Sequence, residues 1–170
     1  MADVEKMISE VLMWEGGYVD DPLDHGGPTN MGITMGTLAA YRGTSVSQDD
    51  VRNLTKDEAV QIYKREYFEK PGFDRLPEAV QAQVFDIGVN SGVCRAVKLL
   101  QQALNDEGQA VAVDGDLGPA TVAAAAAVDP LSLNDALVDR RIKFLQAIVA
   151  NDPSQGRFLT GWLRRARYFA

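Results

Sequence analysis

A short stretch near the start of the chain, residues 15–34, limits what the chain can fold into. It reads EGGYVDDPLDHGGPTNMGIT and holds five glycines and two prolines within twenty residues. Glycine favours turns and proline interrupts helices, so this stretch cannot form one helix. It also holds one glutamate, three aspartates, two threonines and the only histidine of the chain. We therefore expect a polar, turn-rich functional site here.

The residues before this stretch predict an amphipathic helix over 2–15. Apolar residues recur there at spacings of three and four, at Val4, Met7, Ile8, Val11 and Leu12. Glu15 continues this stripe, and Gly16-Gly17 should end the helix. Burial and the helix dipole would both raise the pKa of such a carboxyl group, which suits a general acid. A glutamate that faces water at a frayed helix end fits the spacing equally well.

A second carboxyl group is usually needed for glycoside hydrolysis, to stabilise the oxocarbenium-like transition state or to activate water. Asp24 is our candidate, nine residues after the glutamate, and Thr29 follows five residues later with a hydroxyl that could position the water. Asp20 and Asp21 compete for the role. We prefer Asp24 because residues 26–28, Gly-Gly-Pro, give it the most sharply defined turn.

These residues together resemble the signature of a known family. The matching positions are Glu15 to Tyr18, Asp24, Gly26-Gly27, Thr29 and Gly32 to Thr34. They look like glycoside hydrolase family 108, the N-acetylmuramidases that include secretion-activator proteins and phage endolysins. The resemblance implies that Glu15 is the catalytic acid. The glutamate-aspartate-threonine order is also similar to phage-type lysozymes, whose threonine falls one residue later, so either Thr29 or Thr34 could be its equivalent.

Later segments extend the resemblance over essentially the whole chain. Residues 85–92 and 161–165 also look like the family, and residues 113–121 resemble an element of peptidoglycan-binding modules. The resemblance implies a mainly α, lysozyme-like helical fold with a small β-hairpin or loop element at the active-site cleft. We expect a catalytic part over 1–92, packed directly against a helical peptidoglycan-binding-like part over 93–170.

Local patterns place the remaining elements. They predict short strands at 18–19 and 31–33 and a turn over 47–51. They also predict a helix that begins at 34 or 37 and ends at 41, and helices over 55–69, 77–92, 93–105, 121–128, 131–150 and 158–169. Thr55 and Glu58 have the spacing of a capping box.

Four residues are candidate substrate contacts: Tyr18, Thr34, Tyr63 and Asn90. Two of them have structural alternatives that we prefer. Tyr63 fits a helical core face, and we favour that role over a sugar contact. Asn90 fits a cap for the next helix, and we favour that role slightly. We expect Trp162 to be a core anchor rather than a platform for a sugar ring.

Composition excludes several other classes. A net charge of −7 argues against nucleic acid as a partner, and a single histidine argues against a zinc hydrolase. The single cysteine rules out an internal disulfide. We expect no metal and no organic cofactor.

The chain start lacks the features of a secretory signal, and no apolar run is long enough for a membrane span. We therefore expect synthesis in the cytoplasm and action in the periplasm or cell wall after release, for example through a holin. The expected partner is the glycan strand of peptidoglycan, with a monomer favoured.

The resulting prediction is hydrolysis of the β-1,4 bond between N-acetylmuramic acid and N-acetylglucosamine. Two alternatives stay open at this point. A lytic transglycosylase would use one glutamate and form a 1,6-anhydro ring. A peptidoglycan-binding or secretion-accessory protein would bind without cutting.

Overall fold

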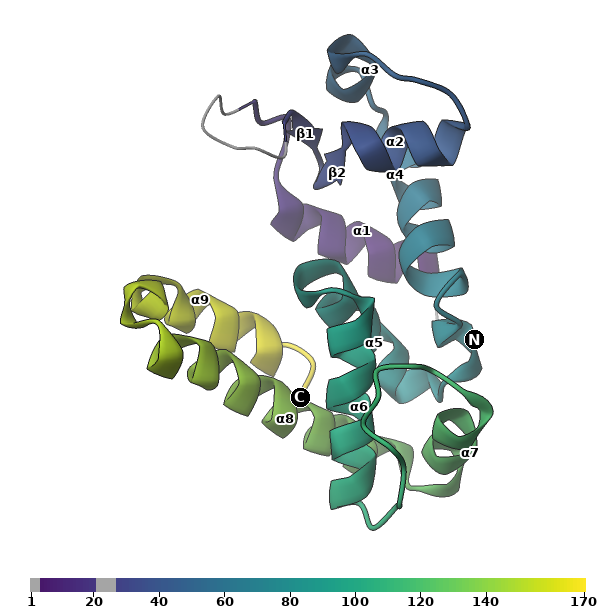
Figure 1. Cartoon of the computed structure of the whole chain (residues 1–170), viewed down its shortest axis with the longest axis vertical. Helices are drawn as coiled ribbons and strands as arrows, with labels where there is room; N and C mark the ends of the chain where they lie inside the picture. Colours follow the sequence, from purple (N-terminus) through teal and green to yellow (C-terminus); the bar gives the residue numbers. More distant parts are fainter. Residues whose placement is uncertain (1–3, 21–26) are drawn as a thin grey trace. The chain divides into compact units, whose positions relative to one another are not determined.

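The structure is a computed structural model and describes residues 4–20 and 27–170 (Figure 1). Its described residues form mostly α-helices, together with one two-stranded antiparallel sheet. The chain divides into two compact units, Met1–Lys70 and Pro71–Ala170, which we describe separately. Among the described helices, none combines the length and the apolar character needed to cross a membrane.

The first unit surrounds its small sheet with helices. Its elements are α1 (Val4–Glu15), β1 (Thr29–Asn30), β2 (Ile33–Thr34), α2 (Met35–Arg42), α3 (Gln48–Arg52), α4 (Lys56–Tyr63) and the π-helix η1 (Lys64–Glu69). Helix α1 packs against α4 and η1, and α2 packs against β2 and α3. Apolar side chains from α1, α2, α3 and α4 are fully buried in its core, at Ile8, Leu38, Val51 and Ile62.

Helix ends in this unit follow from local sequence chemistry. Gly43 ends α2 with a left-handed φ of 68°, a conformation that glycine adopts without strain. Ser47 and Asp50 form a reciprocal capping box at the start of α3. The capping box that we predicted from Thr55 and Glu58, at the start of α4, forms only one of its two hydrogen bonds. Thr55 accepts from the backbone of Glu58, but the Glu58 carboxylate binds Arg42 instead of the helix start.

The sheet is a hairpin with a two-residue turn. Thr29 pairs with Thr34 and Asn30 with Ile33, while an isolated bridge joins Val19 to Thr29. Met31 and Gly32 both have positive φ, of 49° and 75°, as a type I′ turn requires. Our predicted strand over 31–33 was therefore wrong in part, because residues 31 and 32 make the turn.

The second unit is entirely helical in its described elements. These are η2 (Phe73–Arg75), α5 (Glu78–Ser91), α6 (Val93–Asp106), α7 (Pro119–Ala127), α8 (Pro130–Asn151), η3 (Pro153–Gln155) and α9 (Gly156–Arg167). Helix α5 packs against both α6 and α8, and α8 lies alongside α9 (Figure 1). By packing, α5 thus belongs to the second unit. The boundary at residue 92 between functional parts stays a prediction.

The loop before α7 is organised by a buried glutamine. Gln101 donates to the Asp114 carboxylate at 2.8 Å and to the Thr121 hydroxyl at 3.2 Å, and its own oxygen accepts from Gly115. The backbone N–H of Asp116 also binds Asp114, and together with Gln101 it lowers the pKa of that carboxyl. The acidic side chain of Asp114 therefore serves the turn itself.

Candidate active site

Glu15 is the last residue of α1, as the apolar pattern predicts. The face that precedes it is buried, at Met7, Ile8, Val11 and Leu12. Gly16 follows with a φ of 73°, which turns the chain out of the helix. The negative end of the α1 dipole therefore lies at Glu15. The predicted partner Asp24 and its competitor Asp21 lie in residues 21–26, outside the described residues.

Thr29 and Thr34 lie directly opposite each other on the two strands of the hairpin. Thr34 is also the N-cap of α2: its hydroxyl accepts from the backbone N–H of Thr37 at 3.1 Å. It also lies 3.1 Å from the Thr37 hydroxyl. The Thr34 hydroxyl is thus already used to cap the start of α2. Thr29 is the N-cap of no described helix, and the choice between the two threonines for positioning water stays a prediction.

Two polar side chains hold the hairpin in place. Asn30 is buried, and its amide donates to the carbonyl oxygens of Val51 and Arg52 at 3.0 and 3.1 Å, where α3 ends. Tyr63 donates its hydroxyl proton to the carbonyl of Met31 in the turn, at 2.8 Å. The Tyr63 ring is 2% exposed. This agrees with the core role that we favoured for Tyr63 and corrects the candidate sugar contact, because a buried ring cannot stack on a pyranose.

Tyr18 follows the end of α1 and is half-buried. Its hydroxyl accepts from the Gln48 side chain at 3.1 Å, and the Arg52 guanidinium lies 5.1 Å from its ring centroid. Gln48 also donates to the Asp20 carboxylate. Asp20, which competes with Asp24 for the role of the second carboxylate, therefore shares with Tyr18 a hydrogen bond from Gln48 of α3. A substrate contact by Tyr18 stays a prediction.

Asn90 lies one residue before the end of α5 and is exposed. Its side chain donates back to the carbonyl of Asp86 at 2.7 Å, four residues earlier. The N-cap of α6 is Gly92, which makes no side-chain cap. Our preferred interpretation of Asn90 as that cap was wrong because α5 continues through Ser91. A substrate contact by Asn90 stays a prediction.

Sequence reasoning missed a buried cluster of three charges in the second unit. Asp86 of α5 is 1% exposed and binds Arg141 of α8 at 2.5 Å and Arg165 of α9 at 2.7 Å. Arg141 is 55 residues from Asp86 and Arg165 is 79 residues away. One signal was present: a charged residue stands between the apolar residues Phe85 and Ile87 in the middle of the predicted helix.

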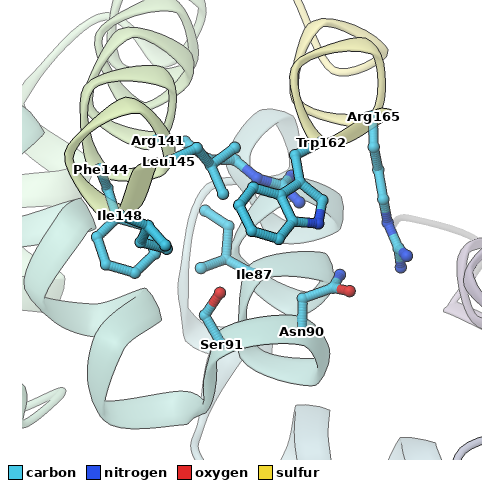
Figure 2. A pocket seen from close by; sticks show the side chains of 9 residues that line it. All are labelled: Ile87, Asn90, Ser91, Arg141, Phe144, Leu145, Ile148, Trp162 and Arg165. Carbon is cyan, nitrogen blue, oxygen red and sulfur yellow. The ribbon is translucent and has the colours of Figure 1, made fainter. Parts of the chain in front are cut away.

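Beside this cluster lies a pocket of about 250 Å³ (Figure 2). Trp162 lines it and stacks on Phe158, with 5.8 Å between ring centroids. Trp162 is half-buried, and its role as a core anchor rather than a sugar platform stays a prediction. In the described part of the chain, no group of three or more His, Cys, Asp or Glu side chains is arranged to hold a metal ion.

Comparison with known proteins gives a family match for each of two regions of the chain. Residues 8–92 match the family described as glycosyl hydrolase 108, and residues 95–167 match a predicted peptidoglycan domain. No match was found among curated proteins. Among solved structures, the chain is similar to SagA of Brucella abortus, with 36% sequence identity and a TM-score of 0.73. That match covers 98% of this chain and 94% of the SagA chain.

The family match spans Glu15, the whole hairpin and α5, and thus includes every candidate catalytic residue. The helical architecture with its small hairpin confirms the predicted mainly α, lysozyme-like fold. The chain belongs to glycosyl hydrolase family 108, and it is a peptidoglycan hydrolase with a peptidoglycan-binding region.

Proposed function

We propose that this protein is an N-acetylmuramidase that hydrolyses the β-1,4 bond between N-acetylmuramic acid and N-acetylglucosamine. The observation that carries the proposal is the position of Glu15 at the C-terminal end of an amphipathic helix and inside the family match. A carboxyl group at the C-terminal end of a helix is favoured in its protonated form by the dipole. Glu15 is thus suited to donate a proton to the glycosidic oxygen.

In the proposed reaction, Asp24 stabilises the positive charge that develops on the sugar or acts as base to water. Thr29 positions the water molecule. Thr29 is preferred to Thr34 because the Thr34 hydroxyl already caps α2. These steps need only proton transfer and water, so the proposal invokes no cofactor.

Replacing the proposed acid tests the assignment directly. Glu15→Gln keeps the shape of the side chain but removes its ionisable proton, so digestion of purified peptidoglycan should slow by at least about a hundredfold. The matched control is Glu5→Gln, which makes the same change at an exposed position of the same helix. Release of soluble fragments is followed over time. A Glu15→Gln protein that digests as fast as the wild type would show that Glu15 is not the acid.

The second carboxylate separates hydrolysis from its nearest alternative. A lytic transglycosylase works with a single acidic residue, whereas a muramidase that uses Asp24 needs both. Asp24→Asn should therefore slow digestion by about a hundredfold or more in a muramidase. Unchanged digestion by this variant would favour the transglycosylase. If the wild type binds peptidoglycan and releases nothing, the protein only binds.

A further inference from the structure

A second pocket lies in the first unit, between helix α2 and the π-helix η1. It has a volume of about 330 Å³ and is lined by Gly36, Thr37 and Ala40 of α2 and by Glu66 and Tyr67 of η1. The α2 wall carries only small side chains, and the η1 wall carries an aromatic ring and a carboxylate. One ring with a few polar groups suits a small ligand that has both an apolar face and hydrogen-bonding groups.

The π-helix places the Tyr67 ring at this pocket. In a regular α-helix, residues four apart share a face, so Tyr67 would follow the buried Tyr63 into the core. Instead, the backbone N–H of Lys70 binds the carbonyl of Arg65, five residues earlier, at 3.0 Å. Phe68, five residues after Tyr63, is buried, and Tyr67 is only half-buried. Short π-helical turns within helices are frequent at functional sites, and this one leaves part of an aromatic ring accessible.

Gly36 keeps the opposite wall of the pocket open. Its φ is not in the positive range that favours glycine, so the backbone does not require glycine here. Outside the helix backbone, the nearest atom to a Cβ at this position would be the Thr34 hydroxyl oxygen, at 3.7 Å, which is an ordinary contact. Ala40, one helical turn later, is exposed and equally small. The α2 wall therefore leaves room for a ligand beside Tyr67.

The polar groups of the pocket are a carboxylate and a hydroxyl. A hydrogen bond from Lys70 at 2.8 Å lowers the pKa of Glu66, and the nearby Arg65 guanidinium adds to this effect, so the carboxylate is ionised at neutral pH. A carboxylate has about four lone-pair positions, more than these two partners use. Thr37 adds a hydroxyl, which both donates and accepts. These groups match the hydroxyl and amide N–H groups of an N-acetylated sugar.

Both walls of the pocket are joined to the hairpin. On the α2 side, the Thr37 hydroxyl lies 3.1 Å from the hydroxyl of Thr34, at the end of β2. On the η1 side, the Tyr67 ring packs against Tyr63 with 5.3 Å between ring centroids, and Tyr63 binds the carbonyl of Met31 in the turn. A glycan strand that binds along the hairpin would therefore pass this pocket.

The size of the pocket distinguishes between the two sugars of peptidoglycan. A volume of about 330 Å³ lies at the lower end of the range for small-molecule sites, so the pocket admits one sugar ring but not a disaccharide. N-acetylmuramic acid carries a lactyl group in addition, whereas N-acetylglucosamine carries only hydroxyl and acetamide groups. We propose that this pocket is a glycan subsite that holds an N-acetylglucosamine unit, with Tyr67 against the sugar ring and with Glu66 and Thr37 bound to its hydroxyl and amide groups. This inference rests on the proposed function for the identity of the polymer.

Binding of a single sugar tests the subsite without any bond between sugars. The probe is the methyl β-glycoside of N-acetylglucosamine, and the matched probe is the methyl β-glycoside of N-acetylmuramic acid. In an NMR titration of the full chain, the first sugar should shift the backbone amide signals of Gly36, Thr37 and Tyr67. The second sugar should bind at least about fivefold more weakly. Unshifted signals at these three residues, or equal binding of the two sugars, would overturn the proposal.

Two variants locate the binding. Ala40→Leu fills the pocket from an exposed position of α2 and should weaken binding of the N-acetylglucosamine glycoside by at least about fivefold, with an unchanged melting temperature. Gln61→Leu is the control, because it places the same side chain at an exposed helical position of the same unit, outside the pocket. It should bind the sugar as the wild type does. If Ala40→Leu binds like the wild type, or Gln61→Leu weakens binding equally, the pocket is not the site.

The outcome is separable from that of the proposed function. A wild-type protein that digests peptidoglycan but shows no shifts at the pocket amides refutes the subsite and leaves the muramidase proposal standing. A protein that binds the N-acetylglucosamine glycoside in the pocket but releases no fragments supports the subsite and refutes the muramidase.

Discussion

The hairpin of the first unit is held by neutral hydrogen bonds, whereas the second unit encloses three charged side chains in its interior. Asn30, Thr34 and Tyr63 each bind backbone atoms and fix the strands and their turn. Asp86 instead joins α5, α8 and α9 through two arginines. The first unit also has an ion-pair network, around Arg42, but it is partly exposed to solvent.

The two kinds of contact differ in the free energy that is needed to bury them. A neutral hydrogen bond to the backbone replaces a bond to water and contributes on the order of 1 kcal/mol. A buried ion cluster must first be desolvated, and it stabilises the fold only while every charge keeps its partner. The hairpin should therefore tolerate the loss of one contact, and the Asp86 cluster should not.

The largest expected effect is at Asp86. Asp86→Asn removes the buried carboxylate that binds both Arg141 and Arg165, which should cost about 3–5 kcal/mol of unfolding free energy. Asp106→Asn is the matched control, because Asp106 pairs with Arg140 in the same unit with its side chain 39% exposed. That variant should cost at most about 1 kcal/mol. Urea unfolding of both variants measures the difference, and equal losses would contradict the comparison.

A smaller effect is expected at the two paired threonines. Thr34→Val removes the N-cap of α2 and should cost about 1 kcal/mol of unfolding free energy. Thr29→Val should change stability by less than about 0.5 kcal/mol, because valine suits a strand and no cap is lost. Thr29→Val should instead lower the rate of peptidoglycan digestion. A stable Thr34→Val protein with reduced digestion would assign the water-positioning role to Thr34.

The smallest loss of unfolding free energy is expected at the partly exposed ion-pair network around Arg42 in the first unit. Hydrogen bonds from Arg42 lower the pKa of Glu58, so the folded state holds this carboxylate ionised more strongly than the unfolded chain does. Its stabilisation is present above the usual glutamate pKa of 4.5 and is lost as the pH falls through the lowered pKa. Glu58→Gln should cost less than about 1 kcal/mol at neutral pH.

Chemical unfolding at several pH values checks this expectation. The difference in unfolding free energy between wild type and Glu58→Gln should shrink as the solution is acidified below the usual glutamate pKa. A difference that stays constant or grows on acidification would mean that the ion pair with Arg42 does not contribute in this way.

The parts of the molecule that could be predicted from sequence are those fixed by near neighbours. The end of α1 at Glu15 follows from a helical stripe and two glycines, and the end of α2 follows from Gly43. The Asp86 cluster could not be predicted in this way, because its partners are 55 and 79 residues away. The hydrogen bonds of Tyr63 and Asn90 could not be predicted either, because spacing alone does not show which backbone carbonyl a polar side chain reaches.

The most direct test of the central claim is the chemistry of the fragments that the wild-type protein releases from purified peptidoglycan. A muramidase adds water across the bond, so mass spectrometry of the fragments, before and after borohydride reduction, should show reducing N-acetylmuramic acid ends. Fragments that end in 1,6-anhydro-muramic acid, each lighter by one water, would contradict the account and identify a lytic transglycosylase. Fragments with reducing N-acetylglucosamine ends would contradict the assignment of the bond.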